Sequence, residues 1–182
     1  MEAAQTLSAE ILQKLSLLSM EHAQLDIQLQ YQEATKDGIS DVQFLFTANK
    51  GSMPQPIEMV ASGGEISRFM LAIKAALSLK KQMPVLILDE IDQGVSGEVA
   101  NKIGFLLQSV SHQMQIISIT HLPQVASKAN HHFKVLKDHS GDKTTTMVQA
   151  LSPKDRIQEI AEMLSGKTPT PSAIANAKEL LK

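Results

Sequence analysis

The stretch of residues 61–91 constrains the fold of this chain more than any other part. A pair of glycines opens a helical pattern of apolar side chains over residues 64–81, and a Met-Pro pair ends it. A continuous apolar run, residues 85–88, then leads to two adjacent carboxylates. Such a run is typical of a strand that is buried on both faces of a parallel sheet. The stretch therefore predicts a helix followed by a central strand of an α/β fold.

Two further elements are predicted before this stretch. An apolar stripe over residues 3–18 indicates a helix, and its heptad-like spacing fits either the end of a coiled coil or a helix packed on the domain. Residues 23–49 alternate apolar and polar side chains on either side of Asp37-Gly38, a dipeptide that favours tight turns. We therefore expect an antiparallel hairpin with one face toward water.

The second half of the chain continues the α/β pattern. A helix that ends at about residue 111 and an apolar strand at 115–120 follow the two carboxylates, and a short helix begins near residue 122. A strand pair is predicted at residues 133–136 and 144–148, and two helices close the chain. We expect the two apolar strands to be parallel neighbours in one sheet.

The composition excludes several classes of protein. The chain has 182 residues, of which 43% are hydrophobic, so it can form a domain with an aliphatic core. The absence of cysteine excludes disulfides, thiol catalysis and Cys-ligated metals, and fits a reducing cytoplasm. No apolar run approaches the ~20 residues that span a membrane, so we expect no membrane partner. The net charge of −2 gives no electrostatic argument for nucleic-acid binding by this chain itself.

Ser62, Gly63, Gly64 and Glu65 form the first candidate site. One interpretation is a capping box, in which Ser62 and Glu65 each bind a backbone N–H of the first helical turn. The glycine pair favours a second interpretation, because each glycine inside a helix costs about 1 kcal/mol relative to alanine. A helix N-terminus without side chains in the way suits close approach by a phosphate group. Taken alone, these residues leave both interpretations open.

Asp89 and Glu90 end the apolar strand and form the second candidate site. They are either a strand exit into water or the acidic pair of a nucleotide hydrolase. In that pair Asp89 helps to hold Mg²⁺, and Glu90 orients or deprotonates the attacking water. His121 follows the next strand, and a lone histidine is usually structural. Since parallel strands end at one edge of a sheet, His121 is also placed to lie near both carboxylates. Residues 92–97 are either a flexible turn or a loop that crosses an interface.

Two other patterns do not qualify as sites. Residues 166–168, Gly-Lys-Thr, resemble the end of a phosphate-binding P-loop, but alanine stands at position 161, where that motif needs glycine, and a helix precedes it. The histidines at 131–132 and 139 have no further ligand at a recognisable spacing, so we interpret them as solvated histidines at strand ends.

The order of the motifs resembles the C-terminal half of an ABC-type ATPase head. It resembles more closely still the RecN family of bacterial DNA repair proteins, which are relatives of the structural-maintenance-of-chromosomes (SMC) ATPases. The resemblance covers nearly the whole chain. It is carried by residues 41–49, 61–68, 89–97, 120–126 and 156–164.

The resemblance implies an α/β fold that forms the C-terminal lobe of an ABC/SMC-type P-loop NTPase head. Within this lobe Ser62, Gly63, Gly64 and Glu65 match the signature motif. That motif contacts the γ-phosphate of ATP bound to the opposite head.

The other motifs match the remaining parts of such a head. Asp89 and Glu90 match the Walker B pair, which implies a Mg²⁺ partner acting through water and a catalytic base. Asp92 lies in the D-loop, which crosses the dimer interface. His121 matches the switch histidine and is, with Glu90, an implied catalytic residue.

The resemblance also implies a division of the chain. Residues 1–22 correspond to the end of a coiled-coil arm helix, and residues 23–182 to the C-terminal half of the head. The family carries its P-loop in an N-terminal half, and no G-x4-G-K-[ST] occurs in this sequence. We therefore expect a C-terminal part of a longer protein that hydrolyses ATP with Mg²⁺, and we expect this part to be inactive alone.

The implied partners are the chain's own N-terminal head half, a second head in a homodimer, and DNA through the full-length protein. The implied location is the bacterial cytoplasm, at the nucleoid. A different possibility is a non-catalytic interaction or scaffold module of a coiled-coil protein. In either case strands 85–88 and 115–120 would lack neighbours, so we expect an isolated chain to expose an apolar face and to form dimers or aggregates.

Overall fold

The computed structural model describes residues 2–36, 38–60, 63–78, 84–89, 91–92, 94–138 and 144–182. The chain divides into two compact units, which we call unit 1 (Met1–Ile119) and unit 2 (Thr120–Lys182). The division after residue 22, which concerns arm and head, stays a prediction.

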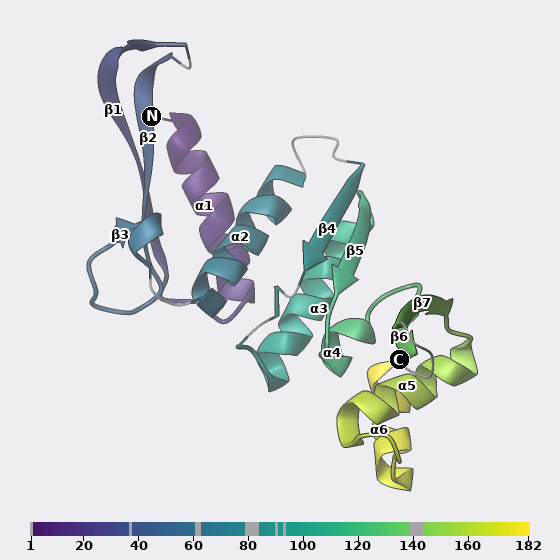
Figure 1. Ribbon diagram of the computed structural model, residues 1–182. Coiled ribbons are helices and arrows are strands. Elements are labelled where there is room, and N and C mark those ends of the chain that lie inside the picture. Colours follow the sequence, from purple (N-terminus) through teal and green to yellow (C-terminus); the bar gives the residue numbers. More distant parts are fainter. Residues whose placement is uncertain are drawn as a thin grey trace. The chain divides into compact units, whose positions relative to one another are not determined.

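The predicted first helix is α1 (Glu2–Leu17), and it packs against α2 (Gly63–Ser78) within unit 1 (Figure 1). Its apolar stripe explains this contact, because Ile11, Leu15 and the following Leu18 are fully buried. The helix ends with Ser19 in the left-handed region (φ 60°), where Met20 N–H donates to the Leu15 carbonyl at 3.0 Å. The first helix is therefore a packed part of this unit.

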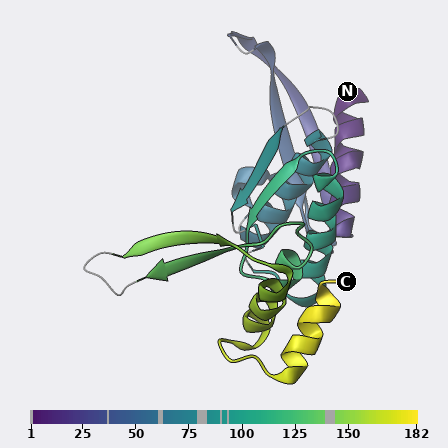
Figure 2. The ribbon, with the colours of Figure 1, turned by 90° about the vertical axis from the view of Figure 1, so that its right-hand side faces the viewer.

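The predicted hairpin is confirmed. Strands β1 (Gln24–Thr35) and β2 (Gly38–Thr47) pair antiparallel, and the short β3 (Gln55–Pro56) pairs with β2 before the 3₁₀ turn η1 (Ile57–Met59). Asp37 of the predicted turn lies outside the described residues. Burial is confined to the base of the hairpin, because its distal end extends beyond the start of α1 (Figures 1 and 2). Apolar side chains in this distal part are exposed: Leu29, Tyr31 and Val42.

The two apolar strands, β4 (Val85–Asp89) and β5 (Gln115–Ile119), pair parallel as predicted. Helix α3 (Gly97–Ser111) lies along one face of the pair and contacts β5 (Figures 1 and 2). The prediction that residues 85–88 are buried on both faces is wrong for this chain. Leu86 and Leu88 are buried, whereas the opposite face of the two strands is exposed, because no described element of unit 1 packs on it. The apolar side chains on that face are Val85, Ile87, Ile117 and Ile119, and Asp89 and Gln115 lie on the same face.

Unit 2 is a small helical core with one hairpin. The short α4 (Pro123–Ala126) precedes the antiparallel strands β6 (Phe133–Asp138) and β7 (Thr145–Ala150), which extend away from α5 (Pro153–Ser165) and α6 (Pro171–Leu180) (Figure 2). Ser152 and Thr170 cap the two long helices, each accepting from a backbone N–H at 3.2 Å. The core of the unit consists of Ala126, Ile160, Ala161, Ala173 and Ala177.

Candidate functional site

The first predicted site lies at the N-terminus of α2. The helix begins at Gly63, whereas Ser62 lies outside the described residues, and the predicted capping box with it. Gly63 is exposed, its φ lies outside the left-handed region, and a Cβ added to it would meet no atom within 4 Å. Gly64 and Glu65 follow in the first turn and are half-buried. Among the described residues, neither the backbone conformation nor a neighbouring atom therefore requires a glycine at position 63.

One turn later, Arg68 ties this end of α2 to the segment that follows α1. Its Nε donates to the Met20 sulfur at 3.3 Å. Phe69, the next residue, is buried and packs its ring against Phe46 of β2, with 4.7 Å between the ring centroids. These contacts connect the first turns of α2 to the end of α1 and to the β1–β2 hairpin.

The second predicted site lies at the carboxyl end of β4. Asp89 is exposed and stands opposite Ile119 in the parallel register, and Glu90 lies outside the described residues. Asp92 is 1% exposed, and its carbonyl accepts from Val95 N–H at 3.3 Å, which closes a tight turn. Gly94 lies in the left-handed region (φ 72°), so this turn is better suited to glycine than to other residues. The side chain of Asp92 is thus buried and does not reach into solvent.

His121 belongs to unit 2 and is exposed. It follows Thr120, whose Oγ1 accepts from Leu122 N–H at 3.0 Å just before α4. Asp89, in contrast, belongs to unit 1, and the expected proximity of His121 to this carboxylate stays a prediction.

No protein-family model matches the chain. DNA repair protein RecN of Rickettsia conorii is 45% identical over 178 residues, which are 98% of this chain and 33% of that protein. RecN of Haemophilus influenzae is 38% identical over 182 residues, 99% of this chain and 33% of that protein. RecN of Treponema pallidum is 40% identical over 185 residues, 100% of this chain and 32% of that protein.

The chain matches a C-terminal portion of RecN. It spans about a third of the length of the curated RecN proteins it matches. The resemblance drawn from the motifs is therefore confirmed along nearly the whole sequence, including the hairpin and the closing helices.

Solved SMC heads share the fold. The Smc head domain with a coiled coil and joint from Pyrococcus yayanosii matches with a TM-score of 0.69 at 21% identity, over 88% of this chain and 29% of that one. A chain from structural work on the ATP-driven dimerization and DNA-stimulated activation of SMC ATPases matches with a TM-score of 0.63 at 20% identity, over 92% of this chain and 97% of that one. The predicted α/β fold of an SMC-type head lobe is thus confirmed, and RecN and SMC heads share it.

Two further findings bear on the RecN-like segment. Among the residues that the structure describes, no helix could cross a membrane, and no three His, Asp or Glu side chains gather into a metal site.

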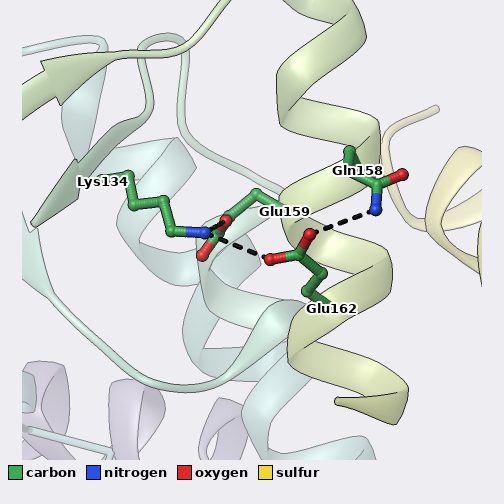
Figure 3. A network of polar contacts seen from close by, with 4 residues as sticks. All are labelled: Lys134, Gln158, Glu159 and Glu162. Atoms are coloured by element: carbon green, nitrogen blue, oxygen red, sulfur yellow. Dashed lines mark hydrogen bonds and ion pairs between the residues drawn. The ribbon is translucent and has the colours of Figure 1, made fainter. Parts of the chain in front are cut away.

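The sequence interpretation missed a cluster of charged residues in unit 2 (Figure 3). Lys134 of β6 contacts the Glu159 carboxylate and also Glu162 Oε2 at 3.2 Å, while Gln158 Nε2 donates to Glu162 Oε1 at 3.1 Å. The hydrogen bond to Glu159 raises the pKa of Lys134, and the hydrogen bonds from Gln158 and Lys134 lower the pKa of Glu162. The cluster fastens the hairpin to α5. The available signal was the spacing of the two glutamates, which places them on one helix face.

Proposed function

We propose that this chain is the C-terminal half of the ATP-hydrolysing head of a RecN-like protein that acts in DNA double-strand break repair. The observation that carries the proposal is the match of nearly the whole chain to RecN, on the fold of an SMC head. The two predicted sites lie at element ends that suit phosphate chemistry, a helix N-terminus and the carboxyl end of a parallel strand.

At the first site we assign the neighbouring head's ATP to the start of α2. Ser62, Gly63, Gly64 and Glu65 form the signature turn, and the γ-phosphate approaches its backbone N–H groups. Support comes from Gly63, because an added Cβ would meet no described atom within 4 Å, which leaves room for close approach. The dipole of α2 favours a negative charge at this end of the helix.

At the second site the chain serves the nucleotide on its own head. Asp89 holds Mg²⁺ through water, and Glu90 acts as the base for the attacking water. Magnesium is usually bound by one or two carboxylates together with substrate phosphates, which fits the exposed Asp89 at the end of β4. Asp92 shapes the turn toward the dimer interface, and His121 contacts the γ-phosphate or the attacking water.

The proposed partners follow from the surfaces that the chain presents. The exposed face of β4 and β5 is where we place the N-terminal half of the same head, which carries the P-loop. The second partner is another head in a homodimer, and the full-length protein engages DNA in the bacterial cytoplasm, at the nucleoid. Without the N-terminal half, the isolated chain should bind ATP weakly or not at all.

The proposal is tested in the full-length protein with Glu90→Gln. The variant should bind ATP, hydrolyse it at least 10²-fold more slowly, as expected for loss of a general base, and accumulate as a closed head dimer. Glu98→Gln is the matched control, because Glu98 lies on α3, its side chain is 81% exposed, and it pairs with Lys102 of the same helix at 3.2 Å. Hydrolysis at equal rates in both variants would remove Glu90 as the base and favour a non-catalytic interaction module.

The signature turn is tested separately with Ser62→Arg. This variant should retain ATP binding by its own head but lose head dimerization, because the nucleotide that Ser62 contacts sits on the other head. Loss of ATP binding with dimerization retained would contradict the assignment of the signature turn to the nucleotide of the other head.

A further inference from the structure

Unit 2 contains a pocket of about 440 Å³ that has no part in the proposed ATP sites. It lies between the base of the β6–β7 hairpin, the first turn of α5 and the residue after α6, and we call it the hairpin pocket. The volume falls within the range of roughly 300–1,000 Å³ that is usual for small-molecule sites. The residues that determine its chemistry are His131, His132, Phe133, Arg156, Ile157 and Leu181.

Arg156 is the fixed charge of the hairpin pocket. Its Nη2 donates to the backbone carbonyls of Ser127, at 2.7 Å, and of Ala129, both after the end of α4. These bonds hold the guanidinium rigidly, and burial lowers its pKa. The Nε of Arg156 is buried and has no hydrogen-bond partner. One edge of the guanidinium therefore serves the fold, and the other has a donor to offer.

His132 adds a second incompletely satisfied group. Its Nδ1 is buried without a hydrogen-bond partner. Burial and the nearby charge of Arg156 lower the pKa of His132, so the imidazole is neutral at pH 7. Its neighbour His131 is exposed at the rim of the pocket. An anion placed here would favour the protonated imidazole and would accept from Arg156 after a small side-chain shift.

Among the described residues, none that lines the hairpin pocket has a carboxylate side chain. Glu159, whose charge acts on His132, is paired with Lys134, as is Glu162. Residues 120–182 as a whole hold nine Lys and Arg against six Asp and Glu, in a chain whose net charge is −2. Unit 2 thus carries an excess of positive charge, which attracts anions.

The other wall of the hairpin pocket is apolar. Phe133 is 59% exposed, although it begins a strand, and Ile157 and Leu181 line the same space. An inorganic anion would leave this wall and most of the volume unused. Aromatic side chains beside cationic groups are the arrangement that proteins use to stack a nucleobase and bind its phosphate.

We propose that the hairpin pocket binds a nucleoside monophosphate, either free or at the 5′ end of a DNA strand. The phosphate monoester lies against Arg156 and His132, and the base stacks on Phe133. None of the residues that line the hairpin pocket is among the residues assigned to ATP.

The test uses the whole 182-residue chain and the imidazole NMR signals of His131 and His132. Titration with dTMP should shift both signals with a Kd below about 1 mM, whereas thymidine should not. Phe133→Leu should weaken dTMP binding about 5- to 50-fold, the loss expected when one base–aromatic stack is removed. Phe105→Leu, at an exposed phenylalanine of α3, is the matched control and should leave the affinity unchanged.

Two further arms separate the possible results. Tighter binding of a 5′-phosphorylated oligonucleotide than of dTMP would assign the strand end as the source, and the reverse order would assign the free nucleotide. If a 5′-hydroxyl oligonucleotide binds as tightly as the 5′-phosphorylated one, the pocket does not recognise a phosphate monoester. If inorganic phosphate binds as tightly as dTMP and Phe133→Leu has no effect, the ligand of the pocket is not a nucleotide. The absence of any shift with up to 10 mM dTMP, in a chain shown to be folded by circular dichroism, would overturn the site itself.

Discussion

The exposed face of β4 and β5 should govern how the isolated chain behaves in solution. Ile87 and Ile117 stand directly opposite each other in the parallel register, at the centre of this face. Replacing both in Ile87→Thr/Ile117→Thr keeps β-branched side chains that suit a strand but makes the face polar. If the face is a surface for the missing half of a head, the double variant should change association far more than folding.

The magnitude follows from the exposure of the four side chains. Val85 is 41% exposed, Ile87 61%, Ile117 45% and Ile119 53%. About half of the surface of these four side chains is therefore still accessible to water and could be buried by a partner. Full burial of such a side chain stabilises by about 1.5–3 kcal/mol, which leaves about 3–6 kcal/mol for the whole face. The two isoleucines account for roughly half of that, enough to change a dimer Kd by more than tenfold.

The assay combines sedimentation velocity with urea unfolding of the isolated chain. The unmodified chain should form dimers or larger species, and the double variant should be monomeric with a free energy of unfolding within about 1 kcal/mol of the parent, as is usual for exposed sites. Leu88→Ala, on the buried face of the same strand, should instead cost about 2–5 kcal/mol. A clean monomer of the unmodified chain at high concentration, or equal destabilisation by both variants, would refute the reasoning.

Three smaller predictions concern single residues. Gly63→Ala should leave the isolated chain as stable or up to about 1 kcal/mol more stable by thermal melting, since its Cβ meets nothing, yet it should slow ATP hydrolysis by the full-length protein; a clear loss of stability would contradict this. Lys134→Met should destabilise unit 2 by about 1 kcal/mol in urea unfolding, because two half-buried carboxylates lose their partner, and no change would mean that solvent screens the cluster. The melting temperature should fall between pH 7 and pH 4. Both Glu162 and His132 have a folded-state pKa below the unfolded value, so the unfolded chain binds more protons as the pH falls, and a flat profile would count against both shifts.

Much of the secondary structure follows from local patterns. The stripe that contains Ile11 and Leu15 forms a helix, and the alternation around Gly38 forms a hairpin, because in both cases the side-chain period alone distinguishes the two structures. The parallel pairing of β4 with β5 was also predictable, because parallel strands need a long crossover connection and α3 supplies one between them.

Other features depend on contacts that no local pattern encodes. An apolar run at residues 85–88 predicts burial, but it cannot tell which faces are covered within this chain, and Ile87 is exposed. The hydrogen bond from Arg156 to the backbone carbonyl of Ser127 joins residues 29 positions apart. Among the candidate site residues, positions on element ends were predictable for Gly63 and Asp89, because helix starts and strand ends have clear sequence signals.

The central claim is that the signature turn and the Walker B pair of one chain serve two different ATP sites. It is tested most directly by mixing two inactive forms of the full-length protein, Gly63→Ala and Glu90→Gln, before ATP is added. In a symmetric dimer half of the molecules would then be mixed, each with one intact site, so hydrolysis should recover to about a quarter of the unmodified rate. If mixed dimers form, as shown with two affinity tags, and the rate stays at the level of the separate variants, the two motifs serve the same site and the claim is contradicted.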